Sequence, residues 1–220
     1  MRQQARFTAV LCDLDGTLID SRDDIAAAFQ WAMRLVVGKA PPASLIVPHI
    51  GKPLEQMARE VGYALSPLQL HTFLETYRQH YAQYCARFTR PYPQVEATLR
   101  RLSQVPIGIV TTKLQEQADM VIQQLALTAW FRHVQGWQPG LRLKPAPDML
   151  LMALAALHCP PEQALMVGDT PADILAGKAA GVTTCAVTYG YGHIDELRRC
   201  APEYVIDTFA ALQAVVLSGP

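Results

Sequence analysis

The sequence lacks an excess of either charge, because lysine plus arginine and aspartate plus glutamate each number 19 in 220 residues. It also lacks a basic block, and a chain without one has no electrostatic basis for binding nucleic acid or an anionic membrane. No apolar run reaches the length of a transmembrane helix, and the N-terminal segment has no signal-peptide core. We therefore expect a soluble, cytoplasmic protein that binds neither nucleic acid nor membrane.

Cysteine pairs are also missing. The chain has five cysteines with no C-x-x-C pair and no spacing typical of zinc ligands: Cys12, Cys85, Cys159, Cys185 and Cys200. An odd, dispersed set indicates reduced thiols rather than a disulfide scaffold. No internal repeat or low-complexity tract occurs, and half of the residues are hydrophobic. The chain can therefore bury the core of one large domain, or of a domain that carries an insertion.

What the sequence does contain is an alternation of apolar and amphipathic segments. Strands are expected at residues 7–12, 105–112, 133–137, 164–169, 183–189 and 204–206. Helices are expected at residues 94–103, 115–126, 147–158, 172–180 and 208–217. Strands that are apolar throughout are typical of a parallel sheet covered on both faces. The sequence predicts an α/β fold, a doubly wound parallel sheet with a Rossmann-like core, built from residues 1–20 and 90–220.

Residues 21–89 show helical patterns and no convincing strand. Ser21 to Asp24 predicts a capping box that opens a helix, and Gly38 is a natural stop for it. Ser66 to Gln69 predicts a second capping box, with Pro67 at the first helical position. The helix that follows carries an aromatic stripe: Phe73, Tyr77, Tyr81, Tyr84 and Phe88. We expect a separate small α-helical unit inserted into the core.

The most informative segment is Asp13-Leu14-Asp15-Gly16-Thr17, which follows the first apolar strand. Two carboxylates that flank one leucine point the same way if the strand pleat continues. Burying two acids is costly unless a cation or protons offset the charge. The segment therefore favours metal binding or acid–base chemistry, with a solvated Asp-Gly turn as the alternative.

Two further strand ends and one loop carry polar residues. Thr111 and Thr112 end one predicted strand, Asp169 and then Asp173 follow another, and Lys144 precedes a helix. Each has an ordinary alternative, because Thr111 and Asp173 suit helix caps and Lys144 suits a solvated loop. In a parallel sheet, however, ligands bind beyond the carboxyl ends of the strands. That rule favours one shared site.

Together these residues have the chemistry that binding and cleaving a phosphate ester requires. Asp13 and Asp169 are hard oxygen ligands of the kind that Mg2+ takes together with water and a substrate phosphate. Thr111 supplies a hydroxyl donor and Lys144 a fixed positive charge, both suited to a phosphate group. An ester also needs a nucleophile and a proton for the leaving alcohol, so two carboxylates with divided roles fit.

Together these residues resemble the haloacid dehalogenase-like hydrolase superfamily, phosphatase branch. The Asp13–Thr17 loop matches its first motif, Thr111 its second, Lys144 its third, and Gly168-Asp169 with Asp173 its fourth. The four motifs occur in order along the whole chain. The resemblance implies a phosphoric monoester hydrolase whose substrate is a small phosphorylated metabolite, acting as a monomer or a homodimer.

The resemblance also assigns roles to the two acids of the first motif. Asp13 attacks phosphorus and forms an aspartyl-phosphate that water then cleaves, while Asp15 protonates the leaving oxygen and later activates the water. Thr111 donates to a phosphoryl oxygen. Dehalogenases and phosphonate-cleaving relatives lack the second acid. A dehalogenase releases halide, which needs no proton, whereas an alkoxide leaving group does. The presence of Asp15 therefore favours phosphate esters or anhydrides.

The implied cofactor is Mg2+. It is expected to bind the Asp13 carboxylate, the Asp15 main-chain carbonyl and Asp169, with Asp173 hydrogen-bonded nearby or reaching the metal through water. Lys144 is expected to neutralise Asp13 and the phosphoryl group.

The helical segment resembles the small cap domain of the superfamily, which closes over the site and selects the substrate. Candidate substrate contacts are Thr112, Lys52 and Arg59, and each of the two cations is alternatively a solvated surface charge. Typical relatives have asparagine at Thr112 and glycine at Gln94. Neither departure changes a catalytic side chain.

The segment Val187–Gly192 is similar to phosphoglycolate phosphatases and to pyrophosphatases close to them. The first substrate to test is 2-phosphoglycolate. The alternatives are a pyrophosphatase or a sugar-phosphate mutase on the same site, and a binding protein that has lost turnover.

Overall fold

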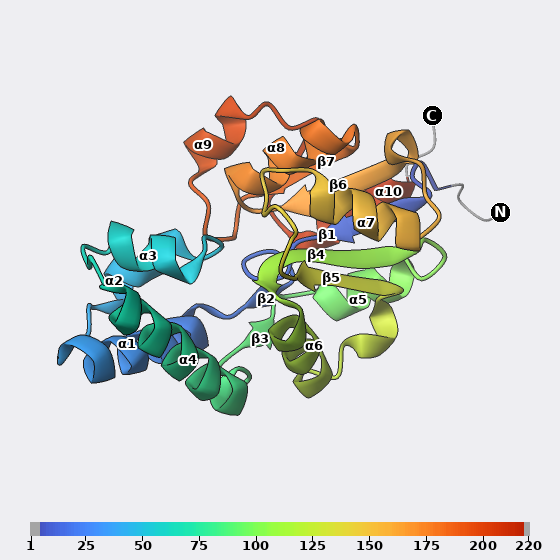
Figure 1. Ribbon diagram of the computed structural model, residues 1–220. Helices are drawn as coiled ribbons and strands as arrows, with labels where there is room; N and C mark the ends of the chain where they lie inside the picture. The colour runs from blue at the N-terminus through green and yellow to red at the C-terminus, as the bar shows by residue number, and fades with distance from the viewer. Residues whose placement is uncertain (1–4, 218–220) are drawn as a thin grey trace. The chain divides into compact units, whose positions relative to one another are not determined.

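The computed structural model describes residues 5–217 (Figure 1). This part of the chain divides into two compact units, one from residues 5–20 and 91–217 and the other from Ser21–Arg90. Within the described residues, no helix is both long and apolar enough to cross a bilayer.

The first unit contains a six-stranded sheet in the order β5-β4-β1-β6-β7-β8, with every pair parallel. Its strands are β1 (Ala9–Cys12), β4 (Ile107–Leu114), β5 (His133–Trp137), β6 (Ala164–Gly168), β7 (Thr183–Val187) and β8 (Tyr204–Ile206). The chain adds β4 and β5 on one side of β1, and then β6, β7 and β8 on the other. This reversal at β1 is the switch point where open α/β sheets bind their ligands.

Helices cover both faces of this sheet. Its helices are α5 (Val95–Arg101), α6 (Gln115–Gln124), α7 (Asp148–Ala156), α8 (Pro171–Ala180), α9 (Ile194–Arg199) and α10 (Leu212–Leu217). Figure 1 shows α7 and α8 in front of the sheet and α5 behind it. Leu11 packs with α7 and α8, and its neighbours Val10 and Cys12, which alternate to the opposite face, are equally inaccessible to solvent. The predicted α/β, doubly wound parallel sheet is confirmed.

Short elements complete the first unit. The 3-10 turns are η2 (Thr128–Trp130), η3 (Pro161–Gln163) and η4 (Phe209–Ala211). The helix expected over residues 208–217 is therefore a 3-10 turn followed by α10. Gln94 is the N-cap residue of helix α5, and its φ of 66° lies in the left-handed region that favours glycine. The glutamine at this position therefore adopts a backbone conformation that a glycine would adopt with less strain.

The second unit is helical, with elements α1 (Arg22–Val37), α2 (Ala43–Ile46), η1 (Val47–His49), α3 (Leu54–Glu60) and α4 (Pro67–Tyr84). Phe29 of α1 meets Phe73 of α4 edge to face, with ring centroids 5.0 Å apart. Tyr77 and Tyr81 continue the buried stripe. The predicted stripe does not extend further, because α4 ends at Tyr84 and Phe88 is 55% exposed.

The two predicted capping boxes have different outcomes. Ser66 and Gln69 form theirs, since each side chain accepts a hydrogen bond from the other's main-chain N–H. At the start of α1 the prediction is wrong, because the Ser21 side chain makes no capping bond. Asp24 Oδ2 instead accepts from the N–H groups of Phe88 and Thr89 and from the Thr89 hydroxyl, at 2.7 to 2.9 Å. The first turn of α1 therefore holds the segment that follows α4.

A two-stranded sheet pairs β2 (Ile19–Asp20) with β3 (Arg90–Pro91). These are the segments at the two boundaries between the units along the chain.

Candidate active site

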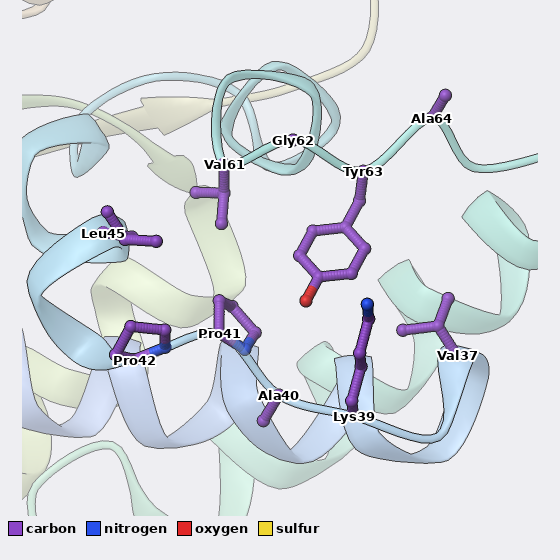
Figure 2. A pocket seen from close by; sticks show the side chains of 10 residues that line it. All are labelled: Val37, Lys39, Ala40, Pro41, Pro42, Leu45, Val61, Gly62, Tyr63 and Ala64. Atoms are coloured by element: carbon purple, nitrogen blue, oxygen red, sulfur yellow. The ribbon is translucent and has the colours of Figure 1, made fainter.

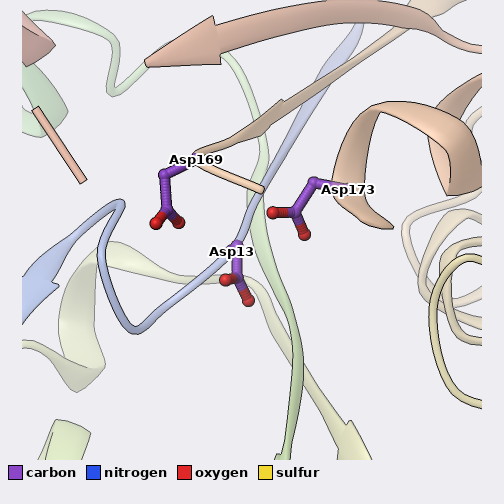
Figure 3. Close-up of side chains that lie close together, drawn as sticks. All are labelled: Asp13, Asp169 and Asp173. Carbon is purple, nitrogen blue, oxygen red and sulfur yellow. The ribbon is translucent and has the colours of Figure 1, made fainter. Parts of the chain in front are cut away.

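Three buried carboxylates meet at the carboxyl ends of the central strands (Figure 3). Asp13 follows β1, Asp169 follows β6, and Asp173 lies in the first turn of α8. The register that sets Cys12 opposite Val167 continues to Asp13 and Gly168, so Asp13 lies one residue out of step with Asp169 at the same edge of the sheet. One oxygen of each of the three carboxylates lies within 4.8 Å of the others, and none of the three residues is more than 6% exposed.

Lys144 joins this cluster from the loop before α7. Its Nζ lies 2.9 Å from Asp13 Oδ1, 2.5 Å from Asp173 Oδ1 and 3.0 Å from the Val110 carbonyl. Burial alone would lower the pKa of this ammonium group, but the two carboxylates outweigh burial and hold its pKa above the usual value. Lys144 is therefore a permanent positive charge, bonded to one oxygen of Asp13.

Asp173 both caps α8 and holds Lys144. Its Oδ2 accepts from the Thr170 N–H and hydroxyl at 2.9 and 2.6 Å, which completes a capping box. Gly168 gives this side chain its room, because a Cβ there would lie 2.3 Å from the Asp173 Cβ. One oxygen of Asp173 is thus paired with an ammonium group and the other belongs to the helix cap, which suits a residue that supports Lys144 more than a direct metal ligand.

Asp169 is held by the first-motif loop and by the loop after β7. Its Oδ1 accepts from the Thr17 hydroxyl and its Oδ2 from the Tyr191 N–H, both at 2.8 Å. The Tyr189 hydroxyl donates to the Thr17 carbonyl at 2.8 Å. Gly16 has a φ of 90°, and a Cβ there would lie 2.3 Å from Asp169 Oδ2. The segment Val187–Gly192 therefore holds Asp169, one of the acidic residues of the site, in place.

The buried cluster carries more negative charge than its one ammonium group neutralises. Three carboxylates share one ammonium group, which leaves two negative charges without a partner inside the cluster. Burial raises the pKa of Asp13 to about 7, against the opposing effect of Lys144. Burial, and then Asp173 and Asp13, raise the pKa of Asp169 as well. A divalent cation with a preference for oxygen ligands would balance this charge, so the donor set fits a metal site.

This charge imbalance predicts a pH-dependent stability in the absence of a divalent cation. Asp13 binds its proton with a pKa of about 7 in the folded protein, against an ordinary value of 3.8. Between those values the folded state holds more protons than the unfolded state, so raising the pH lowers the free energy of unfolding. We expect the Tm in EDTA to fall from pH 5 to pH 8, and Mg2+ to raise it more at pH 8.

Thermal unfolding followed by circular dichroism measures this effect. Asp13→Asn is the matched control, because an amide has no proton to lose and the slope should flatten. A Tm in EDTA that rises over the same range in the unmodified protein contradicts the prediction.

The second acid of the motif has its own lysine, which the sequence analysis missed. Lys113 Nζ lies 3.0 Å from Asp15 Oδ2, and the two side chains are 5% and 9% exposed. The remaining exposure of Lys113 comes from its main chain. Strand β4 runs to Leu114, beyond the predicted end at residue 112. The pairing of β4 with β5 changes register between Val110 and Leu114, so regular alternation along the strand could not have placed Lys113.

Thr111 is buried in β4, and its Oγ1 accepts from the Lys113 N–H at 3.3 Å. It is not a helix cap, because α6 begins only at Gln115. Thr112 is half-buried between these two residues, and its contact with substrate stays a prediction.

The two cationic candidates of the helical unit each have a carboxylate partner within that unit. Lys52 pairs with Glu60, which also lies 2.8 Å from His49 Nδ1. Arg59 Nη1 lies 2.5 Å from Glu55 Oε1, one helical turn away. Such exposed pairs are weak, so they do not prevent either cation from binding an anion. Substrate contact by Lys52 and Arg59 stays a prediction.

The helical unit also contains an open cavity of about 450 Å³ (Figure 2). It is lined by residues between 37 and 45 and between 61 and 64. Lys39 and Tyr63 supply its polar side chains, and the remaining lining is apolar or glycine. It contains none of the residues that the sequence singled out for chemistry. The carboxylate cluster, not this cavity, is the candidate active site.

Comparison with known proteins agrees with this geometry. The sequence profile of haloacid dehalogenase-like hydrolases matches residues 10–187, and the chain belongs to this family. It is 34% identical over 184 residues to a phosphoglycolate phosphatase of Aquifex aeolicus, covering 83% of this chain and 85% of that protein. It is 30% identical over 212 residues to the pyrophosphatase PpaX of Anoxybacillus flavithermus, covering 96% and 97%.

A solved structure extends the likeness to three dimensions. A haloacid dehalogenase-like hydrolase from Streptococcus pneumoniae superposes with a TM-score of 0.86 at 30% identity, covering 95% of this chain and 98% of that one. The predicted family resemblance is confirmed.

Proposed function

We propose that this protein is a Mg2+-dependent phosphatase that hydrolyses a small phosphomonoester through an aspartyl-phosphate, with 2-phosphoglycolate as the first substrate to test. The observation that carries the proposal is the buried Asp13, which is bonded through one oxygen to Lys144 inside an acidic cluster. This pairing leaves the other oxygen for attack on phosphorus. The names of the relatives at 30 to 34% identity support a small phosphorylated substrate.

In the first step Asp13 bonds to phosphorus, the bond from phosphorus to the alcohol oxygen breaks, and that oxygen takes a proton from Asp15. In the second step Asp15 takes a proton from water, the water oxygen bonds to phosphorus, and Asp13 is released together with inorganic phosphate. Lys144 offsets the charge on Asp13 and on the phosphoryl oxygens throughout. Thr111 donates its hydroxyl hydrogen to a phosphoryl oxygen.

The metal site of this proposal uses Asp13, the main-chain carbonyl of Asp15 and Asp169, with Asp173 held back by Lys144 and Thr170. When bound there, Mg2+ supplies positive charge that brings the anionic carboxylate and the anionic phosphate together. Asp169 is suited to this role because the two groups that orient it, the Thr17 hydroxyl and the Tyr191 N–H, are neutral donors that leave its negative charge for a metal.

A pyrophosphatase is the second candidate, because a relative of that name aligns with 96% of this chain. Pyrophosphate needs the same nucleophile and the same proton donor as an ester. A protein that binds without turnover is disfavoured, because Asp13, Asp15, Thr111 and Lys144 are all present and buried.

The test is release of inorganic phosphate from 2-phosphoglycolate, pyrophosphate, glucose 1-phosphate and a nucleoside monophosphate. We expect Mg2+-dependent hydrolysis that EDTA abolishes and added Mg2+ restores, with the highest kcat/KM for phosphoglycolate. A preference for pyrophosphate selects the second candidate. An isomerised sugar phosphate without free phosphate would instead indicate a mutase, and a folded, Mg2+-loaded protein with no turnover of any substrate contradicts catalysis.

A further inference from the structure

The two carboxylates of the first-motif loop are paired with two different lysines. Asp13 Oδ1 accepts from Lys144, and Asp15 Oδ2 lies 3.0 Å from Lys113 Nζ. Lys113 comes from β4, the strand that pairs directly with β1. At 5% side-chain exposure its ammonium group is almost fully removed from water, so its attraction to Asp15 is much stronger than at a surface.

We propose that Lys113 is a positioning residue for Asp15, an inference that rests on the proposed function. Asp15 has to meet the leaving oxygen in the first step and the attacking water in the second. A short side chain held at one oxygen by a buried partner keeps a single orientation. Misplacing a catalytic group by about 1 Å can cost about 100-fold in rate, so this restraint has a measurable consequence.

The main chain of Lys113 provides a second link to the site. Its N–H donates to Thr111 Oγ1, so the Thr111 oxygen accepts this hydrogen bond and its hydroxyl hydrogen is not used in it. The end of β4 is itself fixed, because Gly136 of β5 donates its N–H to Gln115 Oε1 at 2.7 Å. Gln115 Nε2 also donates to the Val134 carbonyl at 3.1 Å. Lys113 therefore lies on a strand end that hydrogen bonds to β5 hold in place, and it contacts both Asp15 and Thr111.

Substrates with different leaving groups can show whether Lys113 acts by positioning Asp15 or in another way. An alkoxide needs the Asp15 proton as the bond to phosphorus breaks, whereas p-nitrophenolate is stable enough to leave without it. The ratio kcat/KM reports the steps up to and including release of the first leaving group. A misplaced Asp15 therefore lowers kcat/KM for alkyl phosphates and changes it little for p-nitrophenyl phosphate.

The experiment compares Lys113→Met with Lys113→Arg, and with Lys178→Met as a control at an exposed lysine of α8. For Lys113→Met we expect kcat/KM to fall by about 100-fold with an alkyl phosphate and by less than about threefold with p-nitrophenyl phosphate. Because Asp15 also activates water, the second step becomes limiting with the aryl substrate. A burst of about one p-nitrophenolate per protein should then appear. Lys113→Arg should recover part of the alkyl activity.

The double variant Asp15→Asn/Lys113→Met completes a thermodynamic cycle. It removes both charges of the pair together, so neither is left buried without the other, and it is expected to fold even if Lys113→Met alone does not. If Lys113 acts through Asp15, the double variant is no less active than Asp15→Asn.

Three outcomes overturn the inference. Equal losses with alkyl and aryl substrates would mean that Lys113 acts on the phosphoryl group. Losses confined to substrates with an anionic leaving group would mean that it binds that group directly. Additive losses in the cycle would mean that it acts independently of Asp15. If the unmodified protein hydrolyses no phosphate ester, the proposed function itself is wrong. That result is distinct from the three outcomes above, which contradict only the role of Lys113.

Discussion

Replacing Asp13 with asparagine is expected to abolish phosphatase activity while leaving the protein folded. An amide cannot attack phosphorus as a carboxylate does, so kcat should fall by about 10⁴-fold or more. The substitution keeps the shape of the side chain and removes one of the unbalanced charges of the cluster. The Tm in EDTA should therefore be unchanged or higher at pH 8. Phosphate release and thermal unfolding measure the two effects.

Asp207→Asn is the matched control, since this aspartate lies exposed after β8. It should retain full activity. Mass spectrometry of the unmodified protein, quenched with acid during turnover, should find a phosphoryl group on Asp13. Substantial turnover by Asp13→Asn, without deamidation back to aspartate, contradicts the assignment of the nucleophile.

Replacing Gly190 with alanine is expected to damage the site. In the loop after β7, only an added methyl group at Gly192 is expected to do more harm. At Gly190 the new Cβ would lie 2.3 Å from the Asp169 Cβ and 2.5 Å from the Gly16 carbonyl oxygen. Neither neighbour is the flexible end of a side chain, so the loop or the first motif has to shift. We expect a loss of about 3 kcal/mol in the free energy of unfolding and about 100-fold in kcat/KM.

Gly140→Ala is the control that distinguishes the steric clash at Gly190 from the general effect of replacing a glycine. Gly140 has a φ of 94° and open space around its would-be Cβ, so only the backbone conformation is strained. It should cost about 1 kcal/mol and leave activity intact. Denaturant unfolding and steady-state kinetics measure both variants. If Gly190→Ala keeps its stability and its response to Mg2+, the loop after β7 does not hold Asp169 in place.

The core strands could be predicted from the sequence because each is a short apolar run closed by polar residues. Strands β5 and β8 match the expected bounds. Helix α9 was not predicted, since its six residues are mostly charged and only Leu197 among them is buried. The position of α9 depends on its packing against α8, and such packing leaves no local pattern in the sequence.

The candidate site could be predicted where a residue directly follows a buried strand, as Asp13 and Asp169 do. Lys113 was missed because the strand was expected to end at Thr112. The extra length of β4 is stabilised from outside the segment, by Gly136 and Gln115. The false capping box at Ser21 has a similar cause, because Asp24 bonds to Thr89, 65 residues away.

The order of the strands also bears on how the protein is made. Strand β1 is the first strand of the sheet to be synthesised, yet β6, one of its two neighbours, follows more than a hundred residues later. Until residues 164–168 emerge from the ribosome, one edge of an entirely apolar strand has no partner. Such an edge invites pairing with other chains, so the growing polypeptide depends on rapid completion or on chaperones. An arrangement that gathers acids from distant segments thus delays any activity until nearly the whole core has been translated.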